Sequence, residues 1–121
     1  GGTLDMCCGT PGADTQVQSN MQHISAIYDH NYTVTEAIHA PRWTHSQAQM
    51  DSMYPHNNEN DLIIESRIDS GVIEDLKNLG HPAREVGPWG GKGSVGAIRV
   101  NASGSLSAAS DPRRDGQALV Y

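Results

Sequence analysis

The chain has 121 residues, of which 36% are hydrophobic, and a formal net charge of −6. These values fit one small globular domain and disfavour a nucleic-acid or anionic-membrane surface, because eight Lys and Arg residues supply no basic stripe. No apolar run approaches the ~18 residues of a membrane span, so we expect no span in this chain. The sequence starts on Gly1-Gly2-Thr3 without an initiator Met, which suggests a processed chain or a part of a larger one.

The first part of the chain is expected to form a strand, a tight turn and a helix. β-tolerant residues over 3–8 predict the strand, which leads into a turn of small residues at 9–13. A helix follows, with Thr15 and Gln18 at capping-box spacing and a left-handed stop at Asn31. Its outer face is predicted to carry Gln16, Gln18, Asn20 and Gln22, and its inner face Val17, Met21, Ile24 and Tyr28, with Ile27 beside them.

A second, short helix is predicted next, followed by a polar stretch. Thr33 and Glu36 have capping-box spacing, and Pro41 must end the helix after Ala40. Residues 44–60 are polar and show little periodicity, so we expect a loop there.

The second half of the chain is expected to alternate strands with one helix. The apolar pattern over 61–68 predicts a strand with a buried face, and Ser70 is placed to cap a helix that Gly80 closes. The predicted inward residues of that helix are Val72, Ile73, Leu76 and Leu79. The remaining elements are a strand at 84–86, a glycine-rich connection at 87–96, a hairpin of strands at 95–100 and 105–109, and a last strand at 118–121. This order predicts one unit over 1–121, of the α/β or α+β class, with helices on a mostly antiparallel sheet.

The turn between the first strand and the first helix is a candidate binding element. Pro11 suits a first helical position, where its missing N–H costs nothing, and Gly12 lets the backbone approach another group closely. A strand that breaks sharply into a helix leaves N–H groups without partners, and these groups suit an oxyanion, a phosphate or a carboxylate. An ordinary capped helix start explains the same residues, and the turn alone leaves both interpretations open.

Other motifs give no support for nucleotide or metal binding. Lys92 stands in a glycine-rich run, but a Gly follows the lysine and a predicted strand follows the run, which argues against a P-loop. The six histidines contain no H-x-x-x-H pair, so we predict no metal site and no cofactor. Cys7 and Cys8 are adjacent, which disfavours a disulfide between them, and we interpret them as buried small residues on or beside a strand.

The loop over 110–116 is a candidate structural element. Asp111 and Asp115 flank Arg113 and Arg114, so one short loop can hold paired carboxylate–guanidinium contacts around a sharp turn. A solvated charged turn is the alternative. Because the loop follows a strand and precedes an apolar segment, we predict that it is buried against the body of the domain.

Several motifs together resemble the C-terminal part of the small subunit of the γ-glutamyltransferases, also called γ-glutamyl transpeptidases. They occur in the family's order and at family-like spacing across nearly the whole chain, and jointly they are highly specific. The matching pieces are Gly9-Thr10-Pro11-Gly12-Ala13, Glu36-Ala37 with Ala40-Pro41-Arg42-Trp43, Ile64-Glu65, Leu79-Gly80-His81, and Ala109-Ser110-Asp111-Pro112-Arg113-Arg114-Asp115-Gly116.

The resemblance implies an N-terminal-nucleophile hydrolase with an αββα sandwich, made as a precursor that cleaves itself into a large and a small subunit. In that family the Thr freed at the start of the small subunit attacks a γ-glutamyl amide, and water or an acceptor amino acid or peptide resolves the acyl-enzyme. The two backbone N–H groups that stabilise the oxyanion map onto Gly12 and Ala13, with Pro11 as a structural residue. The implied partners are a γ-glutamyl small molecule and the rest of the same precursor.

The chain departs from the family pattern in two places. The family's second glycine is Ala13 here, which a φ above zero would strain, so an acylase or amidohydrolase that acts on another amide is an alternative. No residue corresponds to the nucleophilic Thr, so we expect this chain to be inactive by itself, with exposed sheet edges and apolar faces. A non-catalytic scaffold or binding module is the alternative from a different class. Many family members are exported, but the sequence leaves the compartment open.

Overall fold

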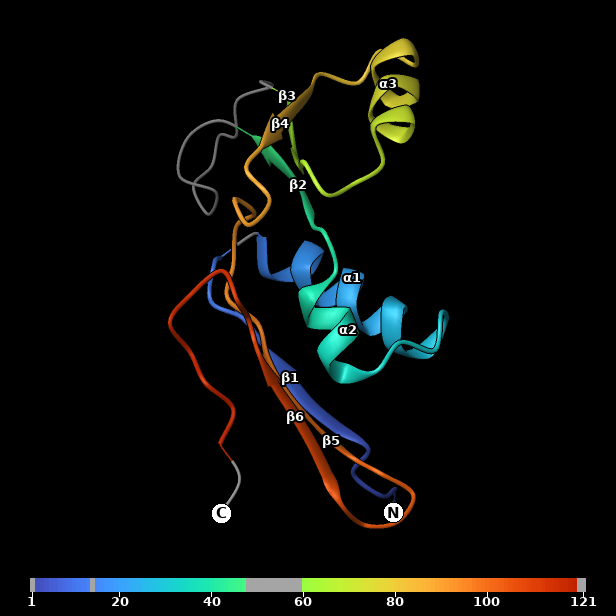
Figure 1. Cartoon of the computed structure of the whole chain (residues 1–121), viewed down its shortest axis with the longest axis vertical. Coiled ribbons are helices and arrows are strands. Elements are labelled where there is room, and N and C mark those ends of the chain that lie inside the picture. Colours follow the sequence, from blue (N-terminus) through green and yellow to red (C-terminus); the bar gives the residue numbers. More distant parts are fainter. Residues whose placement is uncertain (1, 14, 48–59, 120–121) are drawn as a thin grey trace.

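The computed structural model of the chain describes residues 2–13, 15–47 and 60–119 (Figure 1). These residues form three helices and six strands in two separate sheets, which confirms the predicted α+β class. In chain order the elements are β1 (Met6–Gly9), α1 (Thr15–Tyr28), α2 (Val34–His39), β2 (Trp43–Gln47), β3 (Asn60–Glu65), α3 (Ser70–Asn78), β4 (Ala83–Val86), β5 (Gly96–Val100) and β6 (Leu106–Ser110).

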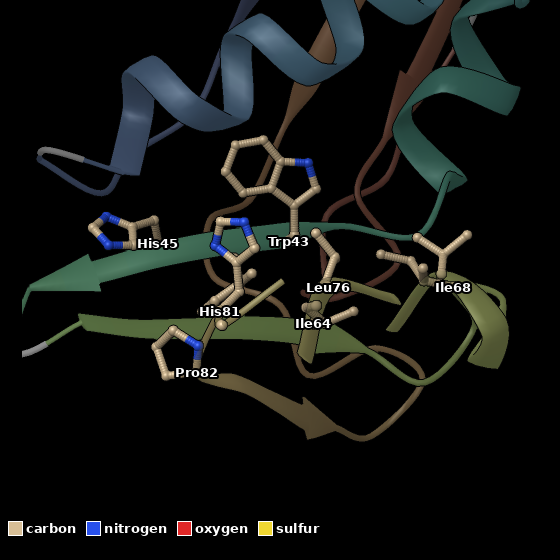
Figure 2. A pocket seen from close by; sticks show the side chains of 10 residues that line it. Trp43, His45, Ile64, Ile68, Leu76, His81 and Pro82 are labelled. Atoms are coloured by element: carbon tan, nitrogen blue, oxygen red, sulfur yellow. The ribbon is translucent and has the colours of Figure 1, made fainter. Parts of the chain in front are cut away.

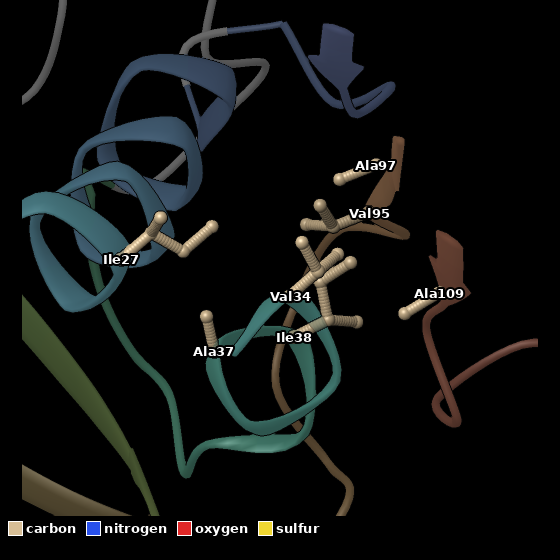
Figure 3. Close-up of a cluster of buried hydrophobic side chains, with 7 residues drawn as sticks. All are labelled: Ile27, Val34, Ala37, Ile38, Val95, Ala97 and Ala109. Atoms are coloured by element: carbon tan, nitrogen blue, oxygen red, sulfur yellow. The ribbon is translucent and has the colours of Figure 1, made fainter. Parts of the chain in front are cut away.

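The first sheet has the order β1-β5-β6 and is antiparallel throughout. The predicted hairpin is confirmed as β5 and β6, in which Gly96 pairs with Ser110 and Val100 with Leu106. Helices α1 and α2 contact one face of this sheet, and side chains from both layers form the main apolar core (Figure 3). The buried core residues are Ile27, Val34, Ala37, Ile38, Val95, Ala97 and Ala109.

The second sheet has the order β2-β3-β4 and lies with α3 at the other end of the molecule (Figure 1). The loop predicted over 44–60 is wrong where the chain forms β2, which pairs antiparallel with β3, and residues 48–59 lie outside the described residues. Strands β3 and β4 are parallel, an exception to the mostly antiparallel sheet that we expected. β2 was missed because pairing with β3, rather than an apolar alternation of its own, makes it a strand.

The face of helix α1 that packs against the core is opposite to the face that we predicted. Four of the expected inner residues are exposed, at 74%, 50%, 39% and 48% for Val17, Met21, Ile24 and Tyr28 respectively, and only Ile27 beside them is buried. The buried residues lie on another side of the helix, at Thr15, Ser19, His23 and Ile27. Gln18 and Gln22, expected to face solvent, instead bond to the backbone of β2, and these bonds fix how the helix is turned.

The capping signals at the two neighbouring helices have different outcomes. At α2 the capping box is confirmed: the Glu36 N–H donates to Thr33 Oγ1 at 3.2 Å, and the Thr33 N–H donates to Glu36 Oε2 at 2.8 Å. At α1 the predicted box of Thr15 and Gln18 is wrong, because the Gln18 amide bonds to β2. The stop at Asn31 is confirmed by its φ of +58°.

Helix α3 is confirmed with small changes at both ends. Its N-cap is Asp69 rather than Ser70, and Asp69 Oδ1 accepts the N–H of Gly71 at 2.8 Å. Gly80 closes the helix with a φ of +91°, as expected. Of the four predicted inward residues, Ile73 is buried and Leu76 half-buried, while the exposed ones are Val72 and Leu79.

Three further expectations concern the ends of the chain and its surface. Residues 116–119 form no strand, so the predicted last strand is wrong there, and 120–121 lie outside the described residues. Cys7 is exposed and Cys8 half-buried, both on β1, so the prediction that both are buried is wrong. Among the described helices, none is long and apolar enough to cross a membrane.

Candidate functional site

The turn between β1 and α1 has an unusual backbone conformation. Gly12 has a φ of +136° and Ala13 a φ of +48°. The left-handed region costs an L-residue roughly 1–2 kcal/mol, so Ala13 is held in a strained conformation. A side chain at Gly12 would also collide with the hydroxyl of Thr15. The turn therefore requires glycine at position 12 and tolerates Ala13 only under strain.

The N–H groups of the turn and those of the first residues of α1 differ in their partners. The N–H groups of Thr15 and Gln16 donate to the carbonyls of Gly12 and Ala13, each at 3.0 Å. Gly12 and Ala13 themselves are exposed, and their own N–H groups have no acceptor within the part of the chain that the structure describes. Pro11, also exposed, has no N–H to contribute. Two adjacent donors thus stay available at the positive end of the α1 dipole.

The turn is tied to the glycine-rich connection. Ser94 donates its N–H to Thr10 Oγ1 at 2.9 Å. Gly93, with a φ of +89°, has no room for a side chain, because a Cβ there would lie 3.1 Å from Thr10 Oγ1 and 3.2 Å from Ser19 Oγ. The connection is therefore packed against the turn and the first half of α1 at Gly93 and Ser94, and the sequence motif gave no sign of this contact.

A buried ion cluster, consisting of Arg42, Glu65, Asp111 and Arg113, lies behind the glycine-rich connection. Arg113 donates to both carboxylate oxygens of Glu65, from Nε at 2.5 Å and from Nη2 at 2.6 Å. Asp111 accepts from Nη1 of Arg113 at 3.0 Å and from Nη1 of Arg42 at 2.9 Å. Two carboxylates and two guanidinium groups balance each other, as buried charges must.

The cluster also holds the glycine-rich connection by its backbone. The Lys92 carbonyl accepts from Arg42 Nη1 at 3.1 Å, and the Val95 N–H donates to Asp111 Oδ2 at 2.9 Å. The Gly91 N–H donates to Glu65 Oε1 at 2.9 Å, and a Cβ at Gly91 would lie only 2.6 Å from that oxygen. Contacts at 91, 92 and 95 fix the segment that carries Ser94.

Hydrogen bonds and neighbouring guanidinium groups keep both carboxylates of the cluster ionised. Burial by itself would raise the pKa of Asp111, but the N–H groups of Val95 and Arg113, together with the guanidinium groups of Arg42 and Arg113, outweigh it and hold this pKa below its ordinary value. For Glu65, burial is likewise outweighed, mainly by the Arg113 guanidinium and the N–H of Arg42, so that its pKa is also lowered.

The structure separates the residues that the sequence grouped in the 110–116 loop. Asp111 and Arg113 are buried, at 1% and 7% exposure, whereas Arg114 and Asp115 are exposed. The partner of Arg113 is not an acid of its own loop alone but Glu65 on β3, which sequence reasoning did not assign to a site. The signal for it was available, because Glu65 ends an apolar strand and an acid there needs a buried cation.

A stacking contact between Arg67 and Trp89 lies beside the ion cluster. Arg67 donates to Glu65 Oε2 at 2.8 Å, and its guanidinium carbon lies 3.6 Å from the centroid of the Trp89 ring. Trp89, which belongs to the glycine-rich connection, therefore packs against the side chain of Arg67.

An apolar hollow lies elsewhere, between the second sheet and α3 (Figure 2). Its volume is about 550 Å³, and no residue of the turn at 9–13 lines it. Apolar side chains from β3 and α3 form part of its wall, with Trp43, His45, His81 and Pro82 around them. It is therefore separate from the candidate site.

Comparison with known proteins identifies the family. A sequence model described as gamma-glutamyltranspeptidase matches residues 1–121. The chain belongs to this family. The resemblance stated from the motifs is thus confirmed, and the N-terminal-nucleophile hydrolase fold with it.

Two curated relatives and one solved structure illustrate the match. The glutathione hydrolase proenzyme of Pseudomonas aeruginosa is 31% identical over 119 residues, which are 98% of this chain and 20% of that protein. The oxamate amidohydrolase proenzyme of Klebsiella pneumoniae is 28% identical over 117 residues, 96% of this chain and 21% of that protein. The structure of gamma-glutamyltranspeptidase from Pseudomonas nitroreducens complexed with L-DON has a TM-score of 0.77 at 27% identity, covering 99% of this chain and 57% of that one. The chain thus spans about a fifth of the length of the curated relatives.

Proposed function

We propose that this chain is the C-terminal region of an enzyme that transfers or hydrolyses γ-glutamyl groups, and that the N–H groups of Gly12 and Ala13 form its oxyanion hole. The chain contributes this turn and the scaffold around it, with Asp111 and Arg113 as structural residues and Arg114 and Asp115 at the loop surface. The nucleophilic Thr comes from a segment of the protein outside these residues. The relatives named glutathione hydrolase support this class of substrate.

The proposed chemistry is acyl transfer through a covalent intermediate. The Thr hydroxyl loses its proton to a base and attacks the amide carbonyl, whose oxygen becomes an oxyanion. The oxyanion collapses, the C–N bond breaks, and the amine leaves with a proton. Water or an acceptor amine then attacks the acyl-enzyme through a second oxyanion. Two N–H donors that are already aimed at this oxygen stabilise both steps without reorganisation.

The observation that carries the proposal is the pair of adjacent N–H groups that have no acceptor among the described residues. The N–H groups of Thr15 and Gln16, at the start of the helix that follows, are bonded to the Gly12 and Ala13 carbonyls, so the turn does not lack partners for all its donors. The available pair belongs to two exposed residues, and α1 adds the positive end of a 14-residue helix dipole.

Each donor can be tested separately by replacing one backbone amide of the protein with an ester. In the intact protein, replacing Ala13 by lactic acid or Gly12 by glycolic acid exchanges one N–H for an oxygen. We expect turnover of γ-glutamyl-p-nitroanilide to fall by roughly 10²–10³-fold for each donor removed. A lactic acid at Ala102, exposed in the turn between β5 and β6, is the matched control.

The ester is preferable to Gly12→Pro, which removes the same N–H. Proline requires a φ near −65°, whereas Gly12 has +136°, so this substitution would rebuild the turn as well. If both esters turn over substrate at the wild-type rate, neither N–H faces the oxyanion and the proposal fails.

An amidohydrolase or acylase acting on another amide is the second candidate. The strained Ala13 in place of the family's glycine favours it, as does the relative named oxamate amidohydrolase. Assays of the intact protein on γ-glutamyl-p-nitroanilide, glutaryl amides and oxamate separate the two. Hydrolysis of none of these amides would instead favour a non-catalytic scaffold module, and we expect the 121-residue chain alone to be inactive in all of them.

A further inference from the structure

The orientation of a backbone N–H is fixed by whatever holds the carbonyl of the same peptide. In a planar trans peptide the C=O and the N–H point in opposite directions, so neither can turn without the other. For the two proposed oxyanion donors, the relevant carbonyls are those of Pro11, which shares a peptide with the Gly12 N–H, and of Gly12, which shares one with the Ala13 N–H.

Thr10 holds the first of these peptides. Its hydroxyl donates to the Pro11 carbonyl, with Oγ1 at 2.9 Å from the oxygen. The same Oγ1 accepts the N–H of Ser94 at 2.9 Å through one of its two lone pairs, so the hydroxyl is bonded both as donor and as acceptor. Ser94 itself lies in the connection that the ion cluster fixes at Lys92 and Val95.

Thr15 holds the second peptide. Its hydroxyl donates to the Gly12 carbonyl at 2.7 Å, and its own N–H donates to the same oxygen at 3.0 Å. Thr15 itself is buried, at 4% exposure. One threonine hydroxyl thus bonds to the carbonyl of each of the two peptides, and in each peptide the N–H points away from the bonded carbonyl.

We propose that Thr10 and Thr15 are positioning residues that aim the Gly12 and Ala13 N–H groups at the oxyanion. The inference rests on the proposed function of the turn. Each hydroxyl fixes the direction of one peptide and, by bonding to its carbonyl, polarises the N–H at the other end. The strained φ of Ala13 makes this support necessary, because an unsupported peptide would relax toward an unstrained conformation.

Valine and serine variants of the intact protein test the proposal. Thr10→Val and Thr15→Val keep the branched shape and lose the hydroxyl, whereas Thr10→Ser and Thr15→Ser keep the hydroxyl. We expect each Val variant to lower kcat by roughly 10- to 100-fold with KM changed by less than about threefold. The reason is that N–H groups that no longer point at the oxyanion stabilise the transition state less. Both Ser variants should stay within about threefold of the wild-type kcat.

Two further variants keep the result interpretable. Thr35→Val, at an exposed position of α2, is the matched control for loss of a threonine hydroxyl. Thr10→Ala and Thr15→Ala replace the Val variants if those fail to fold, and only variants with the wild-type melting temperature are compared.

The outcomes separate this inference from the proposed function. If the backbone-ester variants turn over substrate slowly while the Val variants keep the wild-type kcat, the positioning role is wrong and the oxyanion hole stays in place. Ser variants that lose as much kcat as the Val variants would also overturn it. Wild-type turnover by the esters would instead remove the oxyanion hole itself.

Discussion

Helices α1 and α2 lie side by side on the same sheet, yet their sequences relate to the core in opposite ways. α2 buries its apolar residues, with Val34, Ala37 and Ile38 at 3%, 4% and 0% exposure. α1 exposes its apolar stripe and buries Thr15, Ser19 and His23 together with Ile27. An apolar stripe at helical spacing therefore predicts a helix in both cases but predicts the buried face only for α2.

The difference lies in what each helix meets. α2 packs on β5 and β6, whose facing residues include Ala97 and Ala109, so an apolar face fits there. α1 instead runs along polar partners, because Ser19 adjoins Gly93 of the glycine-rich connection and two glutamines bond to β2. Hydrogen bonds outweigh an apolar stripe when the neighbouring surface presents unpaired backbone groups.

Truncating one apolar residue on each helix gives the largest expected contrast. Ile38→Ala should lower the free energy of unfolding by roughly 2–5 kcal/mol, because it leaves a cavity beneath a fully buried side chain. Val17→Ala, at 74% exposure, should change it by less than about 0.5 kcal/mol. Urea unfolding of both variants measures this difference. Equal losses would mean that the stripe of α1 is buried as well and that the comparison of the two helices is wrong.

Local signals in the sequence predicted much of the fold and part of the site. The capping box of Thr33 and Glu36 and the Gly80 stop involve residues within a few positions of one another, so propensity alone identifies them. The turn at 9–13 was identified in the same way, with the positive φ of Ala13 foreseen from the glycine that it replaces.

Contacts between distant segments were not predictable in this way. Arg113 and Glu65 are 48 positions apart, and Arg42 and Asp111 are 69 apart, so no pattern within one element connects them. Which face of α1 is buried was unpredictable for the same reason, because it depends on β2, a strand that exists only through its pairing with β3. The sequence therefore indicated which residues are special but not which of them meet.

The buried face of α1 also differs from that of α2 in carrying an ionisable group, the imidazole of His23. The side chain is 2% exposed, and neither ring nitrogen has a partner among the described residues. Burial, together with the nearby Arg42 charge, lowers the pKa of His23 to about 4, with Asp111 opposing the shift. The folded protein therefore holds this imidazole neutral.

Acidification should accordingly destabilise the fold through His23. Between the ordinary pKa of 6.5 and about 4, the unfolded chain binds a proton that the folded chain does not, so the free energy of unfolding falls as the pH falls. The total loss is roughly 3 kcal/mol, and most of it occurs below the ordinary value.

His23→Met should remove this slope, which urea titrations between pH 7 and 4.5 would measure. The contributions of Glu65 and Asp111 are lost only below their ordinary pKa values of 4.5 and 3.8, so they lie outside this window. A slope that survives in His23→Met would assign the acid sensitivity to another group.

The smallest expected effect concerns the glutamines that hold α1 in its orientation. Gln22 donates from Nε2 to the Trp43 carbonyl at 2.9 Å and accepts the Trp43 N–H at 3.1 Å, and Gln18 makes the same pair of bonds with His45 at 2.8 Å each. Since Trp43 and His45 are two residues apart on β2, the two amides bond to this strand as a neighbouring strand would.

Gln22→Ala should cost about 1–2 kcal/mol, because it leaves the N–H and C=O of Trp43 without these partners. Gln16→Ala, exposed on the same helix, is the matched control and should change the free energy of unfolding by less than about 0.5 kcal/mol. Gln22→Glu keeps an acceptor for the Trp43 N–H but cannot donate to the carbonyl, so at pH 7 it should not restore the wild-type value. Equal values for the wild type and Gln22→Ala would mean that the amides follow the orientation of α1 rather than determine it.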